Sequence, residues 1–217
     1  MRDRDLSDEG RQQCAELLDA LPWVDKVTHL VSSPHATRLE LVPATFEPVI
    51  STGKRIVALP ELTDTGMFRA SFVLSKRVLA AKFGGKVDLG LLTAGWDAPK
   101  PEGGFGCSPE EWLEHRATAG LLTRVVRLRR GGGERVAVGT AATLPSDAHV
   151  VVVTHGLLAH FPTEEFKASK FRAVVTRGPL EYRSFQFAAE PKDNVRLVET
   201  WESRLRKNLP IASTMSD

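Results

Sequence analysis

The pattern of apolar positions alternates along the chain between helical and strand-like spacing. Residues 6–21 carry apolar side chains at three- and four-residue intervals, which predicts an amphipathic helix. Residues 27–33 and 56–59 are short apolar runs of the kind that form strands. Between them, Ser33-Pro34 predicts the start of a second helix that continues to about Phe46, because proline is tolerated in a first helical turn. Alternation of this kind is typical of a layered α/β protein.

The strongest strand signal is the run of four valines from Val150 to Val153, which is followed by Thr154-His155-Gly156. An apolar β-branched run without alternation predicts a strand buried on both faces of a parallel sheet. His155 then lies at the carboxyl end of that strand, where ligands bind in open α/β sheets. The histidine is therefore a candidate for chemistry, and the alternative is a hydrogen-bonded structural residue.

The segments after residue 60 predict a mixture of helices, strands and loops. Residues 67–83 predict an amphipathic helix closed by Gly84-Gly85, and residues 108–130 predict a helix with a Ser-Pro-Glu-Glu capping start. The many Gly and Pro residues over 87–106 predict an irregular loop, in which Trp96 is either part of a lid or a buried structural residue. The remaining expectations are a short helix at 163–170 and strands at 173–176 and 182–188.

Composition narrows the class of protein and its partners. An apolar fraction of 42% and a charged fraction of 26% are ordinary for a soluble globular protein. The 29 basic and 27 acidic residues nearly cancel, so neither nucleic acid nor a membrane is expected as a partner. Two cysteines form no disulfide framework, and the charged N-terminus has no apolar core of a secretory signal behind it. These features predict a cytoplasmic protein.

Several motifs with known chemistry do not occur in the sequence. It contains no Gly-x-Ser-x-Gly elbow, no phosphate loop ending in Gly-Lys-Ser/Thr and no Gly-x-Gly-x-x-Gly. His149, His155 and His160 are close in sequence, but they lack a helical i, i+4 pair or a Cys-x-x-Cys partner. No metal site and no cofactor are therefore expected.

Six segments together resemble the phosphoglycerate-mutase-like branch of the histidine phosphatase superfamily, and they occur in the order of that family. They are Asp5–Cys14, Leu30–Pro34, Leu59–Leu62 with Asp64–Gly66, Val153–Gly156, Glu181–Ser184 and Glu199–Arg204. Val153–Gly156 is similar to the second-histidine motif of the family. The resemblance implies a three-layer α/β/α sandwich with a mainly parallel central sheet. The sequence has no internal repeat and no long linker, so one domain is expected, which the resemblance makes a phosphoglycerate-mutase-like domain over residues 1–207; residues 208–217 are expected to be a frayed tail.

The resemblance also implies roles for particular residues. In this family a phosphoryl group passes to the histidine of an Arg-His-Gly motif, two arginines and a second histidine bind the phosphate oxygens, and an acid protonates the leaving oxygen. His155 matches the second histidine, and either Asp64 or Glu61 matches the acid. Arg38 lies one residue beyond the position of the family's arginine, which rotates a helical side chain by about 100°. Thr37 occupies that position, and His35 and Thr37 are candidate substitute donors for phosphate.

The largest departure from the family concerns its first strand. No Arg-His-Gly occurs in the sequence, so the nucleophile, one arginine and a central strand of the sheet are missing from this chain. Loss of a central strand leaves two unpaired edges. The sequence therefore predicts either a sheet that has paired again across the gap or a shortened version of a longer protein.

Three functions are compatible with these residues. The first is a phosphate-ester hydrolase or transferase, although the missing nucleophile disfavours turnover by this chain. The second is a catalytically degenerate member that binds a small anionic or phosphorylated molecule, or a protein. The third is a non-phosphatase enzyme of a biosynthetic pathway, with His155 as acid or base and Asp64 or Glu61 as its partner.

Overall fold

The computed structural model describes residues 5–63, 74–94, 96, 148–155, 159, 180–187 and 197–207. Several predicted elements lie outside these residues. They are the helices at 108–130 and 163–170, the strand at 173–176 and the tail from residue 208.

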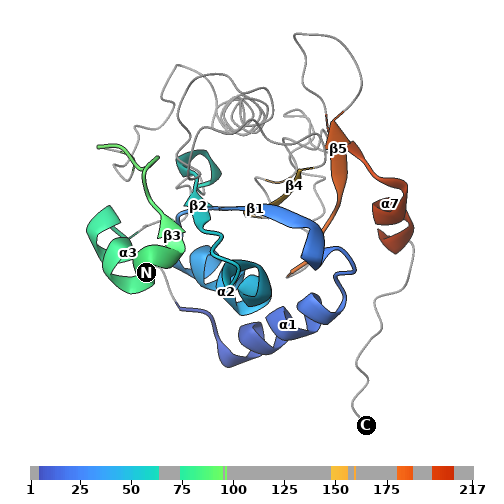
Figure 1. Ribbon diagram of the computed structural model, residues 1–217, viewed down its shortest axis with the longest axis horizontal. Helices are drawn as coiled ribbons and strands as arrows, with labels where there is room; N and C mark the ends of the chain where they lie inside the picture. Colours follow the sequence, from blue (N-terminus) through green and yellow to red (C-terminus); the bar gives the residue numbers. More distant parts are fainter. Residues whose placement is uncertain are drawn as a thin grey trace, which may run out of the picture.

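The centre of the fold is a parallel sheet of four strands in the order β3-β2-β1-β4 (Figure 1). The strands are β1 (Val27–Ser32), β2 (Ile56–Ala58), β3 (Val87–Asp88) and β4 (His149–Val153). All of their pairings are parallel. The chain therefore has the predicted α/β fold with a mainly parallel sheet.

Strand β1 is paired along both of its edges. On one side Leu30 is opposite Ile56, and on the other Leu30 is opposite Val151. The backbone N–H of Ser33 donates to the carbonyl oxygen of Val153 at 2.9 Å and extends the second ladder by one residue. Strands β1 and β4 are therefore direct neighbours in the described sheet.

The prediction that β4 is buried on both faces is wrong. The four valines of this strand are only half-buried, and β4 is the last strand in the described sheet. Valine is favoured in strands because its branched side chain fits a pleated surface, whether or not both faces are covered. A run of valines therefore predicts the strand better than it predicts its burial.

In the described part of the chain, three α-helices accompany the sheet. Helix α1 (Asp8–Asp19) is capped by Ser7, whose hydroxyl accepts from the N–H of Gly10 at 3.1 Å. Helix α2 (Ala36–Ile50) packs against β1 and β2, and α1 packs against α2 on the same side of the sheet (Figure 1). Helix α3 (Lys76–Phe83) ends at Gly84, whose φ of +55° suits glycine.

Two helix boundaries differ from the predictions. Helix α2 continues beyond Phe46 to Ile50, and Phe46 itself has non-helical angles (φ −114°, ψ 28°) at a kink two residues before Pro48. Proline disfavours helical geometry in the residues before it, so the chain bends there and then resumes the helix. The helix predicted at 67–83 begins at Lys76, because Leu74 is not helical and Ser75 is the extended N-cap residue, while residues 64–73 lie outside the described part.

Strand β3 lies where the sequence predicts a loop, so that part of the prediction is wrong. The strand has only two residues, which is too short to show an alternating pattern. It forms against the edge of β2, and the guanidinium of Arg55 donates to the carbonyl oxygens of Gly85 (2.9 Å) and Val87 (3.0 Å). Trp96, further along this segment, is partly buried against the hydrophobic core, as a structural tryptophan would be.

The hydrophobic core lies between the sheet and helix α2. Its fully or almost fully buried members include Leu30, Leu39, Ile56, Leu79 and Leu92. They come from β1, α2, β2, α3 and the segment after β3, so strands and helices share one core. The core therefore fixes the strand ends relative to one another.

A second, two-stranded antiparallel sheet precedes the last described helix. It pairs β5 (Phe185–Phe187) with β6 (Leu197–Glu199), and α7 (Trp201–Lys207) follows. The predicted strand at 182–188 is thus shorter in the structure, while β6 and α7 were not predicted. None of the helices in the described ranges has the length and apolar character needed to cross a bilayer.

Candidate functional site

The candidate site lies at the carboxyl edge of the parallel sheet. Ser33 follows β1 directly, and His155 lies two residues beyond the end of β4. Because β1 and β4 are parallel neighbours, their carboxyl ends meet at one edge, where ligands bind in open α/β sheets. The end of β2 reaches the same edge, since the N–H of Leu59 donates to the carbonyl oxygen of Ser32 at 2.9 Å.

Helix α2 begins at this edge. Pro34 separates β1 from His35, which is the N-cap residue, and Ala36 is the first helical residue. The N-terminus of a helix carries partial positive charge and favours bound anions. The edge of the sheet thus combines a strand end with the end of a helix that suits negative charge.

Three side chains, Ser33, His35 and His155, form a contact cluster, called here the histidine–serine cluster. The Ser33 hydroxyl lies 3.1 Å from Nε2 of His155, and the backbone N–H of His35 donates to the same hydroxyl oxygen at 3.4 Å. The two imidazole rings meet edge to face, with centroids 4.7 Å apart at 72°. Ser33 and His35 are buried, whereas His155 is half-buried and forms the accessible part of the cluster.

The other predicted residues lie around this cluster to different degrees. Thr37 and Arg38 are half-buried in the first turn of α2, where the N–H of Arg38 donates to the carbonyl oxygen of His35 at 3.0 Å. Glu61 is half-buried in the short helix Pro60–Leu62 that follows β2. The structure thus brings His35 and His155 into contact and places Thr37, Arg38 and Glu61 on elements that begin or end at the same edge. Asp64, the other candidate acid, lies outside the described residues.

Ser33 is the member of the cluster that the sequence did not predict. In the sequence, Ser33 was part of the family-like segment Leu30–Pro34 and of a predicted helix start, and neither assigned a role to its side chain. Its partner His155 is 122 residues away in the sequence. Only the parallel pairing of β1 with β4 brings the two together, and no local pattern carries that information.

The described histidines do not gather around a metal position. His149 begins β4 and is exposed, so the length of the strand separates it from His155. Across the described ranges, no group of three or more His, Cys, Asp or Glu side chains is placed to hold a metal ion. His160 lies outside those ranges.

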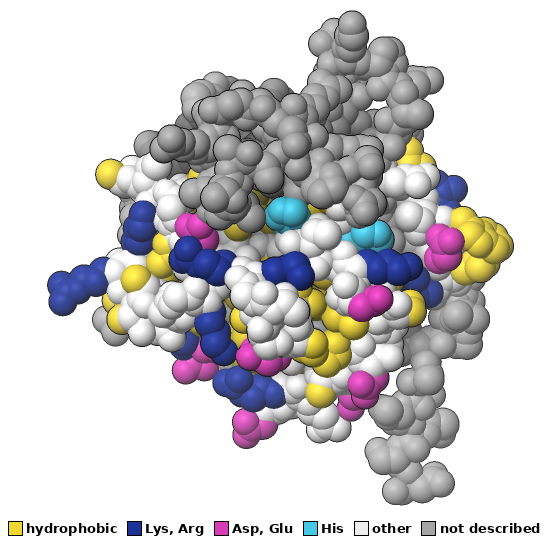
Figure 2. All heavy atoms as spheres, viewed as in Figure 1, with side chains coloured by type: hydrophobic (Ala, Val, Ile, Leu, Met, Phe, Trp, Pro, Cys, Tyr) yellow, Lys and Arg dark blue, Asp and Glu magenta, His cyan; other side chains and the backbone are white. Residues whose placement is uncertain are grey.

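The imidazoles of the histidine–serine cluster suit a negatively charged ligand. Neutral imidazole accepts or donates a proton near neutral pH, and protonated imidazole donates to anionic oxygen. The cluster can therefore bind an anion and exchange a proton with it. On the face of the molecule drawn in Figure 2, Lys and Arg side chains form a band, with histidine and acidic side chains among them.

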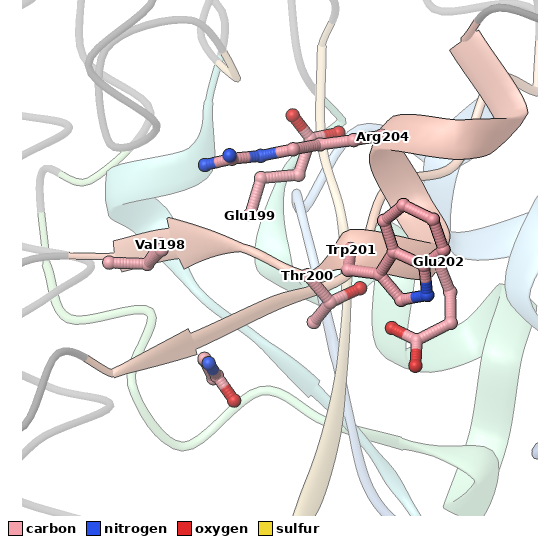
Figure 3. A pocket seen from close by; sticks show the side chains of 7 residues that line it. Val198, Glu199, Thr200, Trp201, Glu202 and Arg204 are labelled. Atoms are coloured by element: carbon pink, nitrogen blue, oxygen red, sulfur yellow. The ribbon is translucent and has the colours of Figure 1, made fainter.

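A separate hollow of about 470 Å³ lies at the junction of β6 with α7 (Figure 3). It is lined by Gln186, Val198, Glu199, Thr200, Trp201, Glu202 and Arg204. In the close view, Arg204 extends past the carboxylate of Glu199, and Trp201 lies beside Glu202. The Ser203 hydroxyl already donates to Glu199 at 2.8 Å, so this carboxylate has a structural role. The residues predicted from the sequence as a site do not line this hollow.

Comparison with models of protein families finds none that matches the chain, and comparison with curated protein sequences also finds no match. The fold and the histidine–serine cluster are therefore the observations from which a function can be argued.

Proposed function

We propose that this chain is a phosphoglycerate-mutase-like member of the histidine phosphatase superfamily, and that the histidine–serine cluster binds the phosphate group of a small phosphorylated molecule. The reaction proposed is hydrolysis or transfer of a phosphate ester. The observation that carries the proposal is the meeting of His155, Ser33 and His35 at the N-terminus of α2, on the carboxyl edge of a parallel sheet.

This geometry supports phosphate binding for two physical reasons. Hydrogen bonds between an ionised group and a donor are shorter and stronger than neutral ones, so a half-buried imidazole is an effective phosphate ligand. The start of α2 adds the favourable end of a helix dipole for the same anion. Arg38 and Thr37, in the first helical turn, are the proposed additional phosphate-binding residues, and either Glu61 or Asp64 is the proposed acid.

A second candidate function is binding without turnover, and one observation favours it. The family attaches the phosphoryl group to a histidine of Arg-His-Gly, and no such motif occurs in this sequence. Removing a covalent nucleophile costs many powers of ten in rate, while binding and electrostatics keep a residual effect. In this candidate the cluster holds an anionic ligand, and His155 forms no phosphohistidine.

Phosphate binding tests the shared part of both candidates. Inorganic phosphate should bind the wild-type protein and raise its unfolding temperature, because a ligand that binds only the folded state stabilises it. His155→Ala should weaken this binding roughly tenfold or more, since a hydrogen bond to a charged group contributes about 1.5–3 kcal/mol. His149→Ala is the matched control, because His149 is exposed at the opposite end of the same strand. Equal phosphate affinity in wild type and His155→Ala would contradict the proposal.

Release of phosphate from an aryl phosphate separates the two candidates. Turnover that disappears in His155→Ala and persists in His149→Ala supports the hydrolase. Binding of phosphate without release supports the binding function. Turnover of a metabolite that carries no phosphate would instead support an acid–base enzyme that uses His155. The proposal includes a cytoplasmic location, which cell fractionation tests.

A further inference from the structure

The Ser33 hydroxyl contacts two partners, the backbone N–H of His35 and Nε2 of His155. The number of hydrogen bonds that a hydroxyl can donate and accept shows which atom is the donor in each contact. A serine hydroxyl has one proton to donate and two lone pairs that accept. One lone pair receives the N–H of His35 at 3.4 Å. The other contact of the oxygen is with Nε2 of His155 at 3.1 Å.

Burial decides the direction of the bond between Ser33 and His155. Ser33 is fully buried, so a hydroxyl proton without an acceptor would lose its hydration and gain nothing in return. Within the part of the chain that the structure describes, Nε2 of His155 is the acceptor that lies in reach of this hydroxyl. Ser33 therefore donates to Nε2, and a nitrogen that accepts cannot carry the ring proton. The proton of neutral His155 is then on Nδ1.

We infer that Ser33 is the positioning residue of His155: its hydroxyl bridges the start of α2 and Nε2, and it holds the imidazole in the Nδ1–H tautomer. The edge-to-face contact with His35, at 4.7 Å between centroids, fixes the plane of the same ring. Ser33 is fully buried and His155 only half-buried. Within the cluster, Ser33 thus acts on a ligand through His155, which is the accessible member. The tautomer follows from the geometry alone, whereas the positioning role in chemistry rests on the proposed function.

The tautomer can be measured without any ligand. In a protein with ¹⁵N-labelled histidine at alkaline pH, where imidazoles are neutral, we expect Nε2 of His155 to resonate in the range of an unprotonated nitrogen and Nδ1 in the range of a protonated one. The His155→Ala spectrum assigns these signals by their loss. Ser33→Ala should shift Nε2 toward the protonated range, because the donor that kept it unprotonated is gone.

Two further variants keep this test specific. Ser32→Ala is the matched control: Ser32 is also fully buried, but its hydroxyl donates to the carbonyl oxygen of Ser33 at 3.0 Å, so the His155 signals should not move. Ser33→Cys retains a weak donor of similar size and should give an intermediate shift. It also serves if Ser33→Ala does not fold, which the amide spectrum reports.

The outcomes separate this inference from the proposed function. Unchanged His155 signals in folded Ser33→Ala, or a protonated Nε2 in the wild type, would overturn the inference. If the wild-type protein fails to bind inorganic phosphate while the His155 signals behave as described, the proposed function fails and the assignment of the tautomer is supported.

Discussion

At the scale of single residues, His29 shows how burial and a neighbouring charge control a protonation state. This histidine is half-buried on β1, and burial lowers the pKa of its imidazole below the usual 6.5, with the positive charge of Lys54 lowering it further. Thr28 gives its hydroxyl proton to the carbonyl oxygen of His149 at 2.9 Å. Its oxygen therefore accepts from Nδ1 of His29, also at 2.9 Å. The Thr28 hydroxyl thus links β1 to the backbone of β4, and the imidazole of His29 is bound to the same hydroxyl.

His29 should make the stability of the fold depend on pH. Because its pKa is lower in the folded protein than in the unfolded chain, the unfolded chain binds more protons as the pH falls below 6.5. This contribution favours folding above pH 6.5, and it is lost as the pH falls toward the pKa of the folded state. We expect His29→Gln to lose less stability than the wild type between pH 7.5 and 5, measured by urea unfolding. The same loss in both proteins would contradict this expectation.

At the scale of elements, β1 is the strand on which the sheet depends. Like β2 it has a neighbour on each side in the described sheet, it is the longest of the four strands at six residues, and Val27, Leu30 and Val31 along it are almost fully buried. An ion pair adds a further connection between elements, since Lys82 of α3 lies 2.6 Å from the Glu40 carboxylate of α2. Hydrogen bonds to Asp5 and Glu40 raise the pKa of Lys82, so its charge persists at high pH.

Leu30→Ala should be among the more destabilising single substitutions. Its side chain is 1% exposed at the centre of the core, and removing a large buried side chain leaves a cavity that costs about 2–5 kcal/mol. Val78→Ala is the control, because Val78 on α3 is 45% exposed and should change stability by less than about 0.5 kcal/mol. Urea unfolding of the two variants measures the difference. Similar values for both would show that β1 does not have this central role.

The sequence predicted those elements whose side chains carry a strong local pattern. The apolar runs predicted β1, β2 and β4, and the spacing of leucines predicted α1, which Ser7 caps. Strand β3 and the end of α2 were missed, because each depends on what a neighbouring element offers. Strand β3 needs the edge of β2 and the donors of Arg55, and the last turn of α2 resumes after the kink at Phe46.

The candidate site was predictable only in part, for a similar reason. A histidine directly after an apolar run is visible in the sequence, so His155 could be placed at a strand end. Its contacts with Ser33 and His35 depend on which strands are neighbours, and that is a property of the sheet as a whole. The resemblance to the histidine phosphatase superfamily stays a prediction, and the tests of His155 address it.

At the scale of the whole molecule, Tyr182 joins the C-terminal elements to the first helix. Its hydroxyl donates to the carbonyl oxygen of Ala20 at 3.4 Å, and its ring meets Trp23 edge to face with centroids 6.0 Å apart. The guanidinium of Arg206 on α7 lies 4.4 Å from the centre of the same ring. Aromatic and cation–π contacts of this kind each contribute about 0.5–2 kcal/mol.

Tyr182→Leu should therefore loosen the C-terminal elements more than the sheet. We expect amide hydrogen exchange to accelerate in β5 and β6, with little change in β1 and β2, and the free energy of unfolding to fall by about 1–2 kcal/mol. Trp201→Leu is the control from the same part of the chain, because Trp201 is 66% exposed. Equal acceleration in all four strands would show that Tyr182 stabilises the whole fold and not only the contact between the C-terminal elements and the first helix.

The pairing of β1 with β4 has a consequence for the synthesis of the protein on the ribosome. Ser33 and His155 are separated by 122 residues, so β1 leaves the exit tunnel long before its second neighbour has been translated. During that interval the backbone donors and acceptors on the edge of β1 that later faces β4 have no native partner. An unpaired strand edge of this kind can pair with other nascent chains. We therefore expect ribosome-released fragments that stop before residue 148 to precipitate, whereas fragments that include β4 stay in solution.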